Sequence, residues 1–323
     1  MSDTSISQQD EFIDTEPRIF RVPVSVKGDR LDKILAQLIP EHSRSRLQSW
    51  IESGCVTVNE KQGKVRQIVG PSDIIAVWEP VAEESLAFTP EPVEFTVLEQ
   101  SSQWIVVEKP AGLVTHPGAG NWHGTLLNGL LYRFPELAHV PRAGIVHRLD
   151  KDTSGLLVVA RTEQSQTHLV RQLQARTVGR EYVALVMGRV KPQGLIDAPI
   201  GRDRKVPVRM STDQPIAPKE ARTHYALLAS GMVQDKAVSW VRCKLETGRT
   251  HQIRVHLSSI GHPLLGDELY GGKPLAGAQR QMLHARRLQF IDPETENMCE
   301  FESLLAQDIQ QVIDNIQWEE APQ

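Results

Sequence analysis

The chain has 323 residues, of which 40% are hydrophobic and 24% are charged, a composition typical of a globular protein of about two domains. No window approaches the roughly 18 uninterrupted apolar residues of a transmembrane helix, and the N-terminus lacks the basic and apolar regions of a secretory signal. Three widely spaced cysteines argue against both a disulfide framework and a cysteine-rich zinc site. We therefore expect a protein of the reducing cytoplasm.

The net charge of -4 conceals an uneven distribution along the chain. Residues 17–78 carry a net charge of +4 and residues 101–297 carry +9, whereas residues 1–16, 79–100 and 298–323 carry -5, -6 and -6. Basic bodies favour a polyanionic partner such as nucleic acid, because neutralised phosphates release counterions. Charge alone leaves an ordinary solvated surface equally open.

The first part of the chain is predicted to be a disordered acidic tail followed by a small folded unit. Residues 1–16 are polar and acidic and have few apolar anchors. Apolar spacing predicts a helix over 30–39, and Ser43 can cap a second helix that Gly54 ends. Alternating apolar residues predict short strands at 20–26, 56–60 and 74–78. Together these elements predict a compact unit over residues 17–78.

A larger unit is predicted over residues 95–310, after an acidic, proline-containing linker over 79–94 and before an acidic tail over 311–323. Apolar runs predict strands at 104–110, 155–161, 181–188, 240–248 and 251–257, and helices at 125–134 and 165–176. Strands and helices mix without a regular βαβ rhythm. The predicted fold class is therefore α+β.

Several common catalytic motifs are absent. The glycines of GAGNWHG at 118–124 have neither the dinucleotide-binding nor the P-loop spacing. His251 and His256 are five residues apart, and no HExxH or paired cysteine accompanies them. No G-x-S-x-G sequence is present, which argues against a serine hydrolase. We expect neither a cofactor nor a metal.

The most informative stretch is AGIVHRLDKDTSGLLVVAR at 143–161, where a polar cluster runs directly into an apolar strand. Reactive groups are often displayed at such a strand entrance. Asp150 and Asp152 offer a pair of carboxylates. Spacing alone leaves open that Asp150 only pairs with Arg148 or Lys151 in a structural loop.

The N-terminal unit resembles the S4 RNA-binding domain over residues 28–78, because RLDKILA, SRSRLQSWIESG and CVTVNE occur in register. The cations on or beside its two predicted helices are candidates for RNA contact, particularly near a helix N-terminus. They are Arg30, Lys33, Arg44 and Arg46. The alternative is that they are ordinary surface cations of helices.

The larger unit resembles the RluA-type pseudouridine synthases, and the whole resemblance covers residues 20–310. Four segments carry it in order: HRLDKDTSGLLVVA, REYVALV, ETGRTHQIRVHLSSIGHPLLGDELYGG and MLHARRL. The resemblance implies a mixed, mostly antiparallel sheet flanked by helices. Within the family, the S4 segment together with HPGAG and VPRAGIVHRLDKDTSG is most similar to the D-type synthases of large-subunit ribosomal RNA.

The resemblance also implies roles for four residues. Asp150 would be the catalytic carboxylate, and Arg254 would pair with it and lower its pKa. Tyr182 would stack on the detached uracil, although a core aromatic is the alternative. Leu283 would border the base. Asp152 is the weaker catalytic candidate.

The substrate implied by the resemblance is large-subunit ribosomal RNA or a pre-ribosomal particle, with the helix 69 hairpin as the target. The uridine must flip out of its stack, and four residues are candidates for holding the RNA: His147, Arg148, Arg249 and Lys109. We expect a monomer. The open alternatives are other ribosomal or transfer RNA uridines, a non-catalytic RNA-binding protein, and a hydrolase that uses Asp150 with Asp152.

Overall fold

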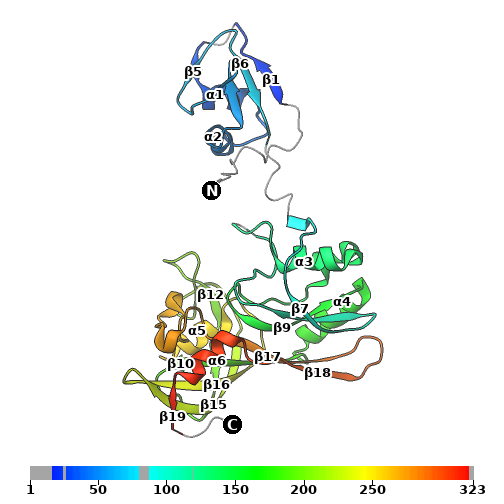
Figure 1. Ribbon diagram of the computed structural model, residues 1–323, viewed down its shortest axis with the longest axis vertical. Helices are drawn as coiled ribbons and strands as arrows, with labels where there is room; N and C mark the ends of the chain where they lie inside the picture. The colour runs from blue at the N-terminus through cyan, green and yellow to red at the C-terminus, as the bar shows by residue number, and fades with distance from the viewer. Residues whose placement is uncertain (1–16, 25–26, 80–86, 119, 320–323) are drawn as a thin grey trace, which may run out of the picture. The chain divides into compact units, whose positions relative to one another are not determined.

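The computed structural model describes residues 17–24, 27–79, 87–118 and 120–319 (Figure 1). The chain divides into two compact units, residues 1–82 and 83–323, which are described separately. No helix of the described ranges is long and apolar enough to cross a membrane. The expected N-terminal tail over 1–16 lies outside the described residues.

The first unit packs two helices, α1 (Leu31–Leu38) and α2 (Arg44–Glu52), against short strands. Ser43 accepts a hydrogen bond from the backbone N–H of Arg46 and so caps α2, and Gly54 adopts a φ of +83° just after the helix. One sheet has the order β1 (Arg18–Arg21), β6 (Ile74–Val77), β3 (Val56–Val58), β4 (Lys61–Gln62). A second pairs β2 (Asp29–Arg30) with β5 (Ile68–Val69).

The second unit is built around a ten-stranded sheet that is antiparallel except where β17 runs parallel to β9. Its main path is β11 (Gln193–Asp197), β15 (Arg222–Val233), β16 (Lys236–Leu245), β10 (Gly179–Met187), β17 (Leu283–Ile291), β9 (Ser154–Ala160), β8 (Trp104–Lys109) and β7 (Thr96–Gln100). Two edge strands join it: β18 (Met298–Glu302) pairs with β17, and β19 (Gln317–Trp318) pairs with β15. A separate three-stranded sheet contains β12 (Ile200–Arg202), β13 (Met210–Ser211) and β14 (Ile216–Lys219).

Helices cover both faces of the large sheet. Successive side chains of a strand point to opposite faces, so each strand can pack against both layers. On β10, Tyr182 and Ala184 join the apolar cluster that includes α3 (Leu126–Arg133) and α5 (Gln252–Ser259). Val183 and Leu185 pack on the other face against α6 (Gln307–Asp314), which is the red helix beside β10 and β16 in Figure 1. A third apolar cluster packs α4 (Glu163–Gln174) against the sheet through Leu169. The fold is α+β, as predicted.

Two predictions about the second unit were wrong. The segment 251–257 forms α5 and not a strand. The expected tail over 311–323 is folded as far as Glu319, because Val312 and Ile313 on α6 are buried, Ile316 just after the helix is buried too, and β19 joins the sheet. Acidic composition therefore did not indicate an unfolded segment here.

The predicted linker over 79–94 is also shorter than expected. Residues 87–94 belong to the second unit, where the side-chain amide of Asn128 on α3 donates to the carbonyl oxygens of Ala87 and Thr89. Glu91 accepts a hydrogen bond from the backbone N–H of Gly124. Of the expected linker, residues 80–86 lie outside the described residues.

Candidate active site

The loop that carries Asp150 is fixed to its surroundings through backbone atoms. Thr115 donates its hydroxyl hydrogen to the carbonyl oxygen of Leu149 at 2.6 Å. The backbone N–H of Gly112 donates to the carbonyl of Lys151 at 2.9 Å. The chain then enters β9 at Ser154. The side chain of Asp150 therefore projects from a short, restrained turn at the entrance of a buried strand.

Lys109 supports this loop from within the protein and is not an RNA-contacting cation as the sequence suggested. Its side chain is fully buried, and Nζ donates to three carbonyl oxygens, those of Pro110 at 2.8 Å, Leu113 at 2.7 Å and Lys151 at 2.9 Å. Burial lowers the pKa of Lys109 to about 7, while the nearby carboxylates of Asp150 and Asp152 act in the opposite direction. Lys109 thus joins the end of β8 to the Asp150 loop.

The carboxylate of Asp150 pairs with Arg254, as the resemblance implied. Nη1 of Arg254 donates to Oδ2 of Asp150 at 3.1 Å, while Nε and Nη2 donate to Oδ2 and Oδ1 of Asp267 at 2.7 and 2.9 Å. Arg254 is only 6% exposed. Burial alone would lower the pKa of Arg254, but the two carboxylates raise it. Asp267 holds the guanidinium in a bidentate pair and leaves Nη1 for Asp150.

A second side of Asp150 faces His251, whose ring is held by Tyr270. Nε2 of His251 lies 4.0 Å from Oδ1 of Asp150, and Nδ1 lies 2.7 Å from the hydroxyl of Tyr270. That hydroxyl also accepts a hydrogen bond from the backbone N–H of Met210, so it links the His251 ring to the chain at Met210. Burial lowers the pKa of His251, which keeps the ring neutral.

Asp150, Arg254, Tyr182 and Leu283 line one cavity of about 590 Å³. Tyr182 comes from β10 and Leu283 from the neighbouring β17, where it pairs with Ala184. Burial raises the pKa of Tyr182, so its phenol stays protonated. Two of the predicted RNA-contacting residues, Arg148 and Arg249, are exposed at the same cavity. Asp152 is not among the residues that line it.

His147 lines the cavity but does not have the charge expected of a phosphate ligand. Its Nε2 accepts the backbone N–H of Val158 at 3.2 Å, and its Nδ1 has no hydrogen-bond partner. Burial, followed by the charge of Arg180, lowers the pKa of His147 to about 3. The ring is therefore neutral near neutral pH, and its visible role is to join its loop to β9.

In the first unit, most of the predicted RNA-contacting cations have partners within the protein. Asp32 is fully buried and accepts hydrogen bonds from Arg30 at 3.0 and 2.9 Å, from Arg44 at 3.0 and 2.7 Å and from Gln48 at 2.6 Å. Burial would raise the pKa of Asp32, but these donors lower it to about 2. Lys33 pairs with Asp29 at 3.2 Å. RNA contact by these residues and by Arg46 stays a prediction.

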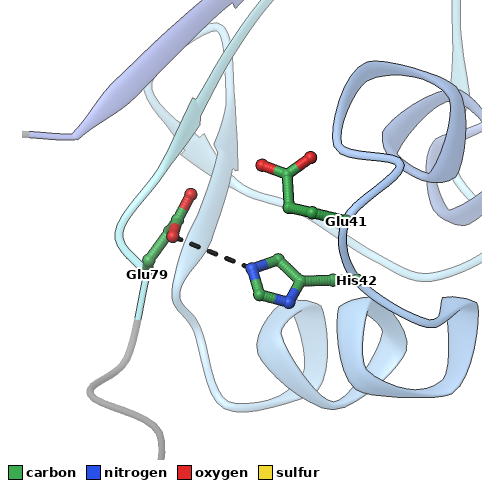
Figure 2. Close-up of side chains that lie close together, drawn as sticks. All are labelled: Glu41, His42 and Glu79. Carbon is green, nitrogen blue, oxygen red and sulfur yellow. Dashed lines mark ion pairs between the residues drawn. The ribbon is translucent and has the colours of Figure 1, made fainter.

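Figure 2 shows the one group of described residues with spacing suited to a metal ion: Glu41, His42 and Glu79. Nε2 of His42 lies 3.9 Å from Oε2 of Glu79. Arg18 forms ion pairs with both glutamates, at 2.6 Å to Oε1 of Glu41. A guanidinium already balances the two carboxylates, so the cluster serves to connect β1 with the end of the unit.

Comparison with known proteins gives two family matches and many relatives. The S4 domain family matches residues 29–75, and the RNA pseudouridylate synthase family matches residues 103–259. A relative from Nitrosomonas europaea, called ribosomal large subunit pseudouridine synthase D, is 48% identical over 296 residues, covering 89% of this chain and 84% of the relative. The chain belongs to the RNA pseudouridylate synthase family. It is an RNA pseudouridine synthase with an N-terminal S4 domain.

Other similarities agree with this membership. A Pseudomonas aeruginosa protein of the same name is 47% identical over 304 residues, covering 90% of this chain and 93% of the relative. A solved structure, human RNA pseudouridylate synthase domain containing 1, superimposes with a TM-score of 0.56 at 28% identity, covering 75% of this chain and 91% of that one. The resemblance read from the sequence is therefore confirmed for the family, the S4 domain and the fold.

Sequence reasoning missed three residues around Asp150 and Arg254. Asp267 and Tyr270 lie within the segment GDELYGG, which carried the resemblance, but no spacing rule connects them to the helix that follows Arg249. His251 was considered only as a metal ligand. Each became visible only when the fold brought distant segments together.

Proposed function

We propose that this enzyme isomerises uridine to pseudouridine in large-subunit ribosomal RNA, with the helix 69 hairpin as its target. The ribosomal substrate is supported by the names of the relatives, which are 41–48% identical over 88–96% of this chain. The helix 69 target rests on the D-type resemblance of the sequence. The observation that carries the mechanism is the Asp150–Arg254 ion pair in a cavity that also presents Tyr182 and Leu283.

The reaction breaks the bond between N1 of uracil and C1′ of the ribose and forms a bond between C5 and C1′. The hydrogen on C5 is released as a proton, and N1 ends with a proton. Asp150 acts on the ribose, either as a nucleophile or by removing a ribose proton. Arg254 binds Oδ2, and among the described residues Oδ1 accepts no hydrogen bond, which favours Oδ1 as the reacting atom.

The detached uracil has to stay in the cavity and turn before it is rejoined. Tyr182 offers an aromatic face on which the ring stacks, and Leu283 offers an apolar edge on the adjacent strand. The phenol of Tyr182 is protonated, so it can act at C5 as a relay that gives up its own proton as it takes the C5 proton. The target uridine reaches this position by flipping, which costs a few kcal/mol and less in a hairpin loop than in a duplex.

The exposed Arg148 and Arg249 at the cavity are suited to bind the phosphates on either side of the flipped nucleotide. The S4 domain adds salt-dependent affinity through its basic surface. These contacts position the RNA, while the pocket accepts the base.

The test is tritium release from ribosomal RNA labelled at C5 of uracil, because formation of the C5–C1′ bond expels that hydrogen. Asp150→Asn should abolish release, and the matched variant Asp152→Asn should retain it, since Asp152 does not line the cavity. Release by Asp150→Asn would contradict the assigned role. Free uracil among the products would indicate hydrolysis. Mapping pseudouridine outside helix 69 would contradict the proposed target.

A further inference from the structure

The catalytic cavity contains a second buried arginine that has received no role so far. Arg180 lies on β10 two residues before Tyr182, so both side chains project from the same face of the strand. Arg180 is 8% exposed and lines the cavity together with Tyr182 and Asp150. The backbone of Gly248 packs closely against it, since a Cβ added to that glycine would lie 2.5 Å from Nη1.

Arg180 differs from Arg254 because no carboxylate of the described residues pairs with it. Its Nε has no hydrogen-bond partner, and within the described ranges its guanidinium forms no ion pair. Arg254 is buried to the same degree but is bound by two carboxylates. Burial lowers the pKa of Arg180, the neighbouring Tyr182 acts in the opposite direction, and the charge of Arg249 acts in the same direction as burial. A desolvated cation without a counter-charge is unfavourable, and such groups are usually paired.

The remaining charge around Arg180 also calls for an anion from outside. The arginines Arg142, Arg148, Arg176 and Arg249 line the same cavity. Of the two carboxylates that line it, Asp150 is bound by Arg254, and Glu246 pairs with His224, Arg222 and Arg176. His147, which feels the charge of Arg180, is itself neutral and therefore does not balance that charge. The group that balances Arg180 therefore has to be supplied by the substrate.

We propose that Arg180 is a catalytic residue that binds a ring oxygen of the uracil and stabilises the negative charge developing there as the N1–C1′ bond breaks. This inference rests on the proposed function and deepens it. When that bond breaks, its electron pair stays with the uracil and spreads onto the ring oxygens. Arg180 lines the cavity on the same strand face as Tyr182, to which the proposed function assigns the base, whereas the exposed Arg148 and Arg249 suit the phosphates. A donor aimed at developing charge in a dry pocket accelerates a reaction strongly.

The first test separates catalysis from binding. Arg180→Met keeps an unbranched apolar stem and removes the charged guanidinium, and it should lower the single-turnover rate at saturating RNA by about 100-fold or more. Affinity for RNA should change less than threefold. Arg180→Lys should recover part of the rate. Gly248→Ala tests the position of Arg180 independently, because the added methyl group displaces the guanidinium and Arg180 itself stays in the protein.

The thermal midpoint of the free protein gives a control against misfolding. Arg180→Met should unfold at the same temperature as the parent or higher, because it removes an uncompensated buried cation. A large fall in that midpoint would show that Arg180 is structural and would overturn the proposal. Unchanged saturating rate with weaker, less salt-dependent RNA binding would assign Arg180 to a phosphate and would also overturn it.

A binding test that needs no turnover separates an error in the role proposed for Arg180 from an error in the proposed function. Barbiturate has uracil's ring oxygens and carries a negative charge at neutral pH. It should raise the thermal midpoint of the parent and of Asp150→Asn, but not that of Arg180→Met. Equal stabilisation of Arg180→Met would contradict the proposal. If Asp150→Asn still releases tritium while Arg180→Met binds no barbiturate, the role of Asp150 fails and that of Arg180 stands.

Discussion

At the scale of single residues, burial decides what a cation can do. Lys109 and His147 were both predicted to contact RNA, Lys109 from its charge alone and His147 because it flanks Asp150. The structure places Lys109 beneath the Asp150 loop and leaves His147 neutral. Arg254 was correctly expected to meet Asp150 because the family motif implies that pair, whereas Arg180 was not considered. Residue type gives the charge, but only the fold gives its surroundings.

Lys109 should control the placement of Asp150. In Lys109→Met, three buried carbonyl oxygens lose their donor, so we expect the free energy of unfolding to fall by about 2–4 kcal/mol. The saturating isomerisation rate should fall more than RNA affinity, because the loop that carries Asp150 loses one of its restraints. Urea unfolding and single-turnover assays measure both quantities. The exposed Lys236→Met is the control, and equal effects in both variants would contradict this role.

His284 should make the stability of the protein fall in acid. It is fully buried, with Nδ1 2.9 Å from Oγ of Ser154 and Nε2 3.0 Å from Oγ of Ser303. Burial, followed by Arg280 and Arg286, lowers its pKa to about 4. Between about pH 6.5 and 4 the unfolded chain takes up a proton that the folded chain refuses. The free energy of unfolding should therefore decrease by up to about 1.4 kcal/mol per pH unit as pH falls through that window.

Urea unfolding at pH 7 and pH 5 checks this prediction. His284→Gln should be less stable than the parent at pH 7 but should lose less stability on acidification. The control His262→Gln changes a half-buried histidine that contacts the carbonyl of Met187, and it should keep the parent's pH dependence. An unchanged pH dependence in His284→Gln would exclude His284 as a source.

At the scale of elements, the segment 251–257, predicted as a strand but helical in the structure, shows where the spacing of apolar residues does not distinguish the two. Ile253, Val255 and Leu257 alternate, as they would in a strand. In α5 every residue from Gln252 to Leu257 is buried, so no solvent-exposed face remains to reveal the helical period. The helix begins at His251, whose φ of 56° turns the chain after the preceding loop. By contrast, α2 has one buried face and a serine cap, and its predicted start was correct.

The contact between β9 and β17 should depend on one glycine. Gly155 has a φ of +113°, and a Cβ there would lie 2.2 Å from the carbonyl oxygen of Ala285 on β17. Gly155→Ala should force the strands apart and lower the free energy of unfolding by about 3 kcal/mol or more. Gly261→Ala is the matched control, because Gly261 also has a positive φ of +87° but open space around it. Similar losses in both variants would assign the effect to backbone strain alone.

At the scale of the whole molecule, composition predicted two folded bodies but misjudged their borders. The acidic stretches at 87–94 and 311–319 pack onto the second unit through a few apolar residues and backbone hydrogen bonds. Net charge reports on the exposed side chains of such segments, whereas burial depends on apolar residues at helical spacing, here Ile309, Val312 and Ile313. The division into an S4 domain and a synthase domain was confirmed because motifs, not charge, located it.

The S4 domain should contribute to RNA binding through cations that are exposed to solvent. Arg30 and Arg44 are bound to the buried Asp32, so Arg44→Gln should mainly destabilise this unit. Lys33 and Arg46 are exposed at the helices, and replacing both with glutamine should weaken RNA binding and reduce the slope of log K against log salt by about 0.7–0.9 per cation. The saturating isomerisation rate should not change, because the catalytic cavity belongs to the other unit.

Binding titrations from low to high salt measure the slope, with exposed Lys191→Gln and Lys236→Gln together as the charge-matched control. An identical slope in both double variants would show that the S4 domain binds without neutralising phosphates.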